Sequence, residues 1–145
     1  MPEQKTLARA RRDKRDGKAP TTQAGEFVRE EIHHIREGKH GARSTKQAIA
    51  IGLSKARRAG VKLGAPKGSA ETRWKADQDR EAGQHPEHKV SARRSRAVSG
   101  ALKREPKKSA SRQAISKQAK KSAAQRVKRA RSTAAIKAAR TRRAA

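Results

Sequence analysis

Half of the large apolar residues of this chain lie in one segment of 45 residues, which limits what can fold. Nine of the eighteen Phe, Trp, Met, Ile, Leu and Val residues occur between residues 21 and 65 of a chain of 145. Phe, Ile, Leu and Val together make up roughly a tenth of the chain, less than highly charged chains need in order to fold throughout. A large globular core is therefore excluded.

Charge divides the chain into four parts. These are a basic N-terminal arm (1–20), the apolar segment (21–65), a linker with balanced charge (66–90) and a Lys/Arg/Ala-rich tail (91–145) with a net charge of +18. The whole chain carries 40 Lys and Arg against 13 Asp and Glu, and such an excess predicts a polyanionic partner. The absence of cysteine, of a signal peptide and of a long apolar run predicts a cytoplasmic protein without disulfides.

The spacing of apolar residues predicts a first helix from about Thr22 to Glu37 that Gly38 ends. Its apolar stripe consists of Phe27, Val28, Ile32 and Ile35.

A second helix is predicted to begin after Ser44. Ser44 and Gln47 fit a capping box, in which the serine oxygen accepts from a free backbone N–H and the glutamine returns to another. At the far end, Gly60 suits the left-handed C-cap position, with Val61 contacting Ala56 as in a Schellman motif. The two helices should form a helical hairpin, and its small core predicts association into a homodimer through residues 21–65.

Outside the hairpin we expect little stable structure. Residues 66–90 read as a spacer with one short helix near residues 70–82. Residues 107–145 contain no Gly, Pro or acid and permit a helix, but repulsion among their cations should keep the free tail mostly unfolded. The predicted fold is mostly α, a small helical hairpin with extended, largely disordered or conditionally helical basic tails.

No arrangement of residues predicts an enzyme. The chain has no G-x-S-x-G, no Walker-type phosphate loop and no cysteine nucleophile. The paired carboxylates Glu30 with Glu31 and Asp77 with Asp79 lie among charged residues, and we interpret them as solvated.

The histidines raise the question of a metal site. His33, His34 and His40 flank one turn, and His85 and His88 are three residues apart around Pro86. We interpret them as surface histidines, because a helix interrupted by Pro86 cannot readily present both His85 and His88 and no third ligand lies near that pair. No metal and no cofactor are therefore predicted.

Two groups of cations in the hairpin are candidates for nucleic-acid binding. Lys39, Arg43 and Lys46 surround the start of the second helix, where free N–H groups favour a phosphate. Lys55, Arg57, Arg58 and Lys62 form a second cluster at its other end. A helix-turn-helix with its turn at Gly52–Ser54 is the sharper alternative, but its second helix would meet Gly60 after about six residues, fewer than a recognition helix needs.

The tail supplies the remaining candidates. They are Arg93, Arg94, Arg96, Lys107, Lys108, Lys120, Lys121, Arg126, Lys128, Arg129, Arg131, Lys137, Arg140, Arg142 and Arg143. Trp74, between Arg73 and Lys75, is interpreted as a linker anchor rather than as a platform for bases.

The stretch EGKHGARSTKQAIAIGLSKARRAG resembles a small bacterial family of unknown function. The family is marked by a basic, Gly/Ser-containing loop, by KQAIAIGLS and by an ending of alanine, basic residues and glycine, and the likeness covers Glu37 to Gly64. The resemblance implies no activity. Residues 91–145 resemble, in composition, the Lys/Ala-rich tails of linker-histone-type and bacterial histone-like proteins.

These observations predict a sequence-nonspecific, histone-like DNA-binding protein of a bacterial nucleoid that acts through phosphate contacts. One alternative is an RNA-binding or ribosome-associated protein, because both nucleic acids present the same phosphates. Another is a protein-interaction module whose tail is an electrostatic tether. None of these three predicted functions involves a membrane.

Overall fold

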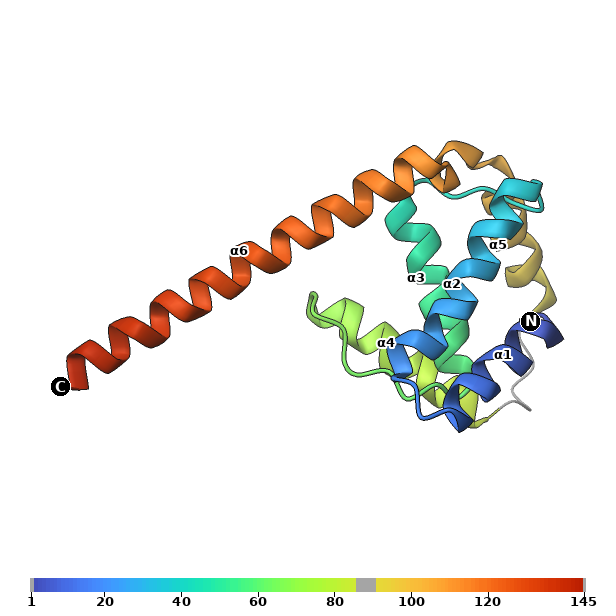
Figure 1. The fold of residues 1–145 in the computed structure, drawn as a ribbon. Coiled ribbons are helices and arrows are strands. Elements are labelled where there is room, and N and C mark those ends of the chain that lie inside the picture. The colour runs from blue at the N-terminus through green and yellow to red at the C-terminus, as the bar shows by residue number, and fades with distance from the viewer. Residues whose placement is uncertain (1, 86–90, 145) are drawn as a thin grey trace. The chain divides into compact units, whose positions relative to one another are not determined.

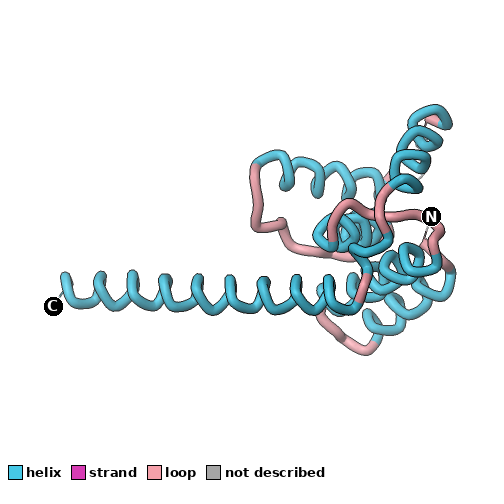
Figure 2. Tube along the Cα trace, turned by 90° about the horizontal axis from the view of Figure 1, so that it is seen from above, coloured by secondary structure: helices cyan, strands magenta, loops and turns pink. Residues whose placement is uncertain are grey.

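The computed structural model describes residues 2–85 and 91–144, and every regular element within these ranges is a helix (Figure 1, Figure 2). The chain divides into two units, Met1–Ala110 and Ser111–Ala145. The elements of the first unit are α1 (Gln4–Arg15), α2 (Pro20–Glu37), α3 (Thr45–Arg58), α4 (Ala70–Gln84), α5 (Ala92–Arg104) and the 3₁₀ turn η1 (Lys107–Ala110). The second unit contains α6 (Arg112–Ala144).

The predicted helical hairpin is present as α2 and α3, which run in opposite directions and pack on each other (Figure 1). Gly38 and Gly60 both have the left-handed conformation that ends a helix, with φ of 81° and 83°. The Schellman motif at the end of α3 is confirmed, because the N–H of Val61 donates to Ala56 and that of Gly60 donates to Arg57.

The predicted capping box at the start of α3 is confirmed in its first half. The backbone N–H of Gln47 donates to the Ser44 Oγ at 3.2 Å. The side chain of Gln47 accepts from the N–H of Arg43, at 2.7 Å, rather than from that of Ser44. The bond still satisfies a backbone donor next to the helix start, one residue earlier than the motif prescribes.

Close contact between α2 and α3 depends on Gly52. A Cβ at this position would lie 2.7 Å from the Cα of Val28 on α2. The core around the crossing is built mostly from small residues, and Phe27 and Ile35 are its largest fully buried apolar side chains. Small residues let two backbones approach closely, so few large side chains suffice here.

The prediction of disordered tails is wrong. Residues 4–15 form α1, which packs on α2, and residues 91–144 are largely helical. The buried side of α1 consists of Thr6, Ala10 and Asp13 and contains no large apolar residue that is fully buried. An apolar pattern search therefore does not detect this helix, because its buried stripe is mostly short and polar.

The tail is helical for a different reason. Gly and Pro are absent from α6, whose residues are mostly Ala, Lys, Arg, Gln and Ser. Alanine and the long unbranched cations have high helix propensity, whereas a like-charge pair at i, i+4 costs only about 0.2–0.5 kcal/mol. Repulsion was overestimated in the sequence-based prediction relative to the propensity summed over 33 residues.

Residues 66–90 are more than a spacer, since α4 packs on α3. Ala76 is buried at this contact, and a Cβ at Gly83 would lie 2.6 Å from the carbonyl oxygen of Arg58. The short helix expected near residues 70–82 is thus confirmed and somewhat longer. His88 lies outside the described residues.

The loop between α2 and α3 is held by the last turn of α5 and by the segment that follows it. The N–H of Gly41 donates to Leu102, that of Ala42 donates to Pro106, and the Thr45 hydroxyl donates to the Ser109 carbonyl at 2.7 Å. Arg36 adds a bond to the carbonyl of Ala110 at 2.8 Å. Residues 91–110 were predicted to be part of the tail because of their charge, but they belong to the first unit.

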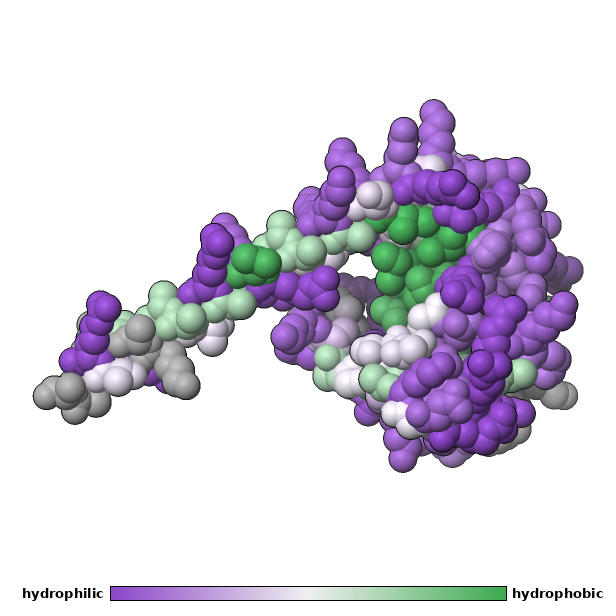
Figure 3. Space-filling view, viewed as in Figure 1, coloured by the Kyte–Doolittle hydropathy of each residue, from purple (hydrophilic) through white to green (hydrophobic). Residues whose placement is uncertain are grey.

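Apolar surface remains over α2 and α3, where Figure 3 shows a green area. The partly buried apolar residues of these helices are Val28, Ile32, Ile49, Ile51 and Leu53. Among the described residues, no helix combines the length and the apolar character that spanning a bilayer requires.

Candidate nucleic-acid interface

Among the helices, α6 carries the largest number of cations. Its 33 residues include no acid. Its twelve cations are Arg112, Lys117, Lys120, Lys121, Arg126, Lys128, Arg129, Arg131, Lys137, Arg140, Arg142 and Arg143. Ten of them have described side chains, and all ten are exposed. Because α6 has no acid of its own, none of these charges is neutralised within the helix.

The cations of α6 surround the helix, but one side carries more of them. At 100° per residue, six fall within a sector of about 100°. We call them the basic stripe: Lys117, Lys120, Lys121, Lys128, Arg131 and Arg142. Arg126, Arg129 and Arg140 lie on the opposite side. Val127 and Ile136 on α6 are 52% and 55% exposed, so they form no core within this unit.

Other predicted tail cations lie in the first unit. Arg93, Arg94 and Arg96 are exposed on α5, and Lys107 and Lys108 are exposed in η1. The Lys107 side chain lies against Gly38, where a Cβ would clash with its Nζ. A cation at the C-terminal end of α2 interacts favourably with the helix dipole.

The cations around the start of α3 are in different environments. Lys39 forms ion pairs with Glu37 at 3.1 Å and with Glu3 at 3.3 Å. Hydrogen bonds to these two carboxylates raise the pKa of Lys39 above its usual value. Arg43 and Lys46 are exposed. Of the three cations proposed to surround a phosphate, one is therefore already engaged with acids.

The second predicted cluster, at the end of α3, is mostly engaged within the fold. Lys55 contacts two buried carboxylates, Arg57 is buried, and the Nε of Arg58 lies 2.8 Å from Asp79 on α4. Lys62 is exposed. The acids that engage Lys55 and Arg58 lie 21 to 25 residues away in sequence, so spacing along the chain did not reveal them.

Glu30 and Glu31 are buried, at 5% and 1% exposure, so their interpretation as solvated acids is wrong. Burial alone would raise the pKa of Glu30. The Thr6 hydroxyl, the backbone N–H of Glu3 and the Lys55 ammonium outweigh it and hold that pKa below its ordinary value. These contacts join α1 and α3 to α2 through one buried carboxylate.

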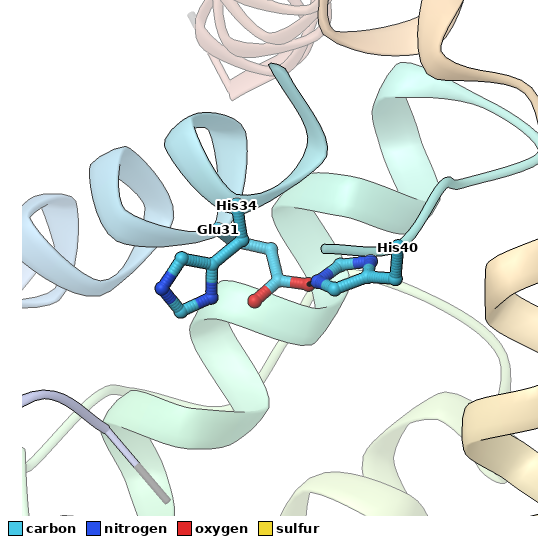
Figure 4. A group of neighbouring side chains, drawn as sticks. All are labelled: Glu31, His34 and His40. Atoms are coloured by element: carbon cyan, nitrogen blue, oxygen red, sulfur yellow. Dashed lines mark ion pairs between the residues drawn. The ribbon is translucent and has the colours of Figure 1, made fainter. Parts of the chain in front are cut away.

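Glu31 faces two histidines (Figure 4). His40 Nε2 lies 3.0 Å from Glu31 Oε1, and one ligand atom from each of Glu31, His34 and His40 lies within 4.8 Å of the others. These side chains are of the types that bind a transition metal. His34 and His40 were candidates from the sequence, but Glu31 was not, although its position three residues before His34 places it on the same side of a helix.

The described part of the chain also carries an exposed aromatic residue. Trp74 on α4 is 58% exposed, so it does not anchor the segment by burial. Its neighbour Lys75 pairs with Glu71 at 2.6 Å. As the chain's single tryptophan, it serves as a fluorescence reporter for the first unit.

The comparisons with known proteins concern the hairpin and say nothing of α6. Neither the search of curated proteins nor the search of solved structures finds a match to this chain. Residues 14–67, which include the stretch from Glu37 to Gly64 on which the resemblance rests, match the model of a family of unknown function, DUF6496.

Proposed function

We propose that the protein binds DNA without sequence specificity and that α6 makes most of the phosphate contacts. The observation that carries the proposal is a continuous helix of 33 residues with twelve cations and no acid. Every described cation on it is exposed. This arrangement leaves a dense positive charge without internal counter-charges.

The dimensions of α6 suit a duplex. With a rise of 1.5 Å per residue, 33 residues span about 50 Å. That length corresponds to about 15 base pairs at 3.4 Å each. The cations of α6 would displace the counterions condensed on the phosphates along this path, and the release of those counterions drives sequence-independent binding.

The residue types of α6 support phosphate contacts rather than base readout. Specific recognition of bases needs several side chains that present matched donors and acceptors at defined places in a groove. Apart from its cations, α6 carries mainly Ala, Ser, Thr and Gln. We therefore expect it to position the protein on the backbone, with condensation or bridging of a bacterial nucleoid as the biological result.

RNA is the main alternative ligand, for example at a ribosome. Charge does not distinguish the two polymers, because both carry a phosphate at each nucleotide. A second alternative is that the first unit binds a protein and α6 only adds electrostatic attraction.

Competition tests the proposed ligand. Full-length protein is bound to a labelled random-sequence duplex at physiological salt and challenged with unlabelled duplex, single-stranded DNA or structured RNA of equal phosphate concentration. DNA binding predicts that the unlabelled duplex competes best. Complete displacement by a smaller amount of RNA would favour the ribosomal alternative.

Homodimerisation through residues 21–65 stays a prediction. The prediction of a dimer was based on the small core of an isolated hairpin. In the structure α1, α4 and η1 pack on the hairpin and supply contacts that the prediction expected from a second copy. The partly buried apolar residues of α2 and α3 are the surface at which a second copy would dock. Sedimentation at micromolar concentration measures the oligomeric state, and a folded monomer would contradict the prediction of a dimer.

A further inference from the structure

We propose that Glu31, His34 and His40 form a binding site for a divalent transition metal ion such as Zn²⁺. All three belong to the first unit. Glu31 and His34 lie three residues apart on α2, and His40 follows in the loop after the left-handed Gly38. Their ligand atoms lie within 4.8 Å of one another.

The surroundings of His34 favour a metal ligand. Its Nε2 lies 2.8 Å from Oε1 of Glu3, and a carboxylate accepts a hydrogen bond. In the neutral ring, Nε2 therefore carries the proton and Nδ1 carries the lone pair. Figure 4 shows Nδ1 as the ring nitrogen turned toward the Glu31 carboxylate. A histidine that binds a metal commonly donates its second N–H to a carboxylate in this way.

His40 has the complementary tautomer. Its Nδ1 lies 3.0 Å from the carbonyl oxygen of Gly41, which accepts only, so in the neutral ring Nε2 carries the lone pair. That Nε2 lies 3.0 Å from Glu31 Oε1, which is also an acceptor. Two acceptors at this distance repel each other unless a cation or a proton lies beside both. This pair is the strongest observation for the site.

Glu31 is the anionic centre of the group. It is 1% exposed, and neither of its oxygens makes a hydrogen bond of good geometry, although Lys55 Nζ lies 2.7 Å from Oε2. Lys55 therefore neutralises one side of the carboxylate and leaves Oε1 facing His40. A buried acceptor without a hydrogen bond is costly, and coordination of a metal would satisfy it.

The ligand set indicates the class of metal. Two imidazoles and one carboxylate, with a fourth position left to water, are a common arrangement for Zn²⁺, and Co²⁺, Ni²⁺ and Cu²⁺ accept the same donors. Mg²⁺ and Ca²⁺ prefer oxygen ligands and are not expected. The His34 and His40 side chains are 14% and 16% exposed, which gives an ion access from solvent.

Small rotations would complete the site. Ligand atoms on a tetrahedral zinc, at bonds of about 2.0–2.2 Å, lie roughly 3.3–3.5 Å apart. The distance between His40 Nε2 and Glu31 Oε1 is close to that value, so His34 would have to move most. The competing arrangement has no metal and a protonated His40 paired with Glu31.

Metal titration of the full-length protein distinguishes the two arrangements. Zn²⁺ is titrated by calorimetry at neutral pH, and Co²⁺ is followed by its visible absorption, which reports nitrogen and oxygen coordination. The proposal predicts one ion per chain with release of protons, and at least a tenfold loss of affinity in His34→Ala and in His40→Ala. Glu3→Gln, which keeps the ligands, should weaken binding by about tenfold or more.

His33 provides the matched control, since it is the exposed neighbour of His34 and lies outside the group. His33→Ala should bind Zn²⁺ and Co²⁺ like the unmodified protein. Circular dichroism confirms that each variant is folded, and His40→Gln replaces His40→Ala if the alanine variant is not. Absence of saturable binding would overturn the site in favour of the protonated pair. Equal losses in His33→Ala and His34→Ala would also overturn it, because they indicate dispersed surface binding.

Discussion

Lys55 Nζ lies 2.7 Å from Oε2 of Glu31, and this buried ion pair joins α3 to α2. The same ammonium lies 3.3 Å from Glu30 Oε1. A cation that looks like a phosphate contact in the sequence therefore neutralises two adjacent buried carboxylates. Removing it would leave both acids without their compensating charge in a poorly solvated place.

Lys55→Met should destabilise the first unit by about 3 kcal/mol, the lower end for a broken buried pair, because the Lys55 side chain is 23% exposed. Urea unfolding followed by Trp74 fluorescence measures the loss. Lys46→Met, at an exposed position of the same helix, is the control and should change stability by less than about 0.5 kcal/mol. Equal effects of the two substitutions would argue against a structural pair at Lys55.

Acid should destabilise the first unit partly through Glu30. Its pKa lies below the ordinary value of 4.5 in the folded chain, so the unfolded state binds the proton more readily. The stabilisation is present above that ordinary value and is lost as the pH falls through the lower, folded pKa. Urea midpoints between pH 7 and pH 3 should fall less steeply for Glu30→Gln than for the unmodified protein. Parallel profiles would contradict this role of Glu30.

Gly52 and Gly25 make a matched pair of glycine substitutions in helices. Gly52→Ala should destabilise the protein, because its Cβ would lie 2.7 Å from the backbone of Val28 and overpacking costs about 1–3 kcal/mol. Gly25→Ala has no atom within 4 Å of the new Cβ and should stabilise α2 by about 0.5–1 kcal/mol. The change in melting temperature of each variant shows whether the substitution stabilises or destabilises the protein. Stabilisation by both alanines would mean that α2 and α3 do not approach closely at Gly52.

Salt dependence tests whether α6 supplies the binding energy. If half of its twelve cations contact duplex phosphates, log K should fall with log salt at a slope of about −5. Equilibrium titrations at several salt concentrations, on random and AT-rich duplexes, measure the slope and any sequence preference. Removal of Ser111–Ala145 should abolish most of the salt slope. Trp74 fluorescence confirms that the first unit remains folded. A slope that survives this truncation would transfer the interface to the first unit.

The basic stripe can be tested with equal changes in charge. Lys128, Arg131 and Arg142 changed together to Gln remove three cations from the stripe, and the same change at Arg126, Arg129 and Arg140 removes three from the opposite side. If one side of α6 faces the DNA, the first variant should reduce the salt slope by nearly 3 and the second by less. Equal reductions would indicate that α6 has no preferred binding face.

Local signals in the sequence determined the hairpin and its boundaries. Ser44, Gly38 and Gly60 act on backbone groups a few residues away, so their roles can be predicted without knowledge of the rest of the fold. The apolar spacing of the two helices is equally local. The accumulation of cations toward the C-terminus is a property of composition alone.

Only the tertiary structure decided which charges are free. Lys55, Arg58 and Glu31 acquire their roles from partners that are distant in sequence, and desolvation depends on everything packed around them. The buried stripe of α1 was hidden for a related reason, because short polar residues such as Thr6 become core residues only when α2 covers them. The helical state of α6 was misjudged because local propensity outweighs a repulsion that screening and spacing keep small.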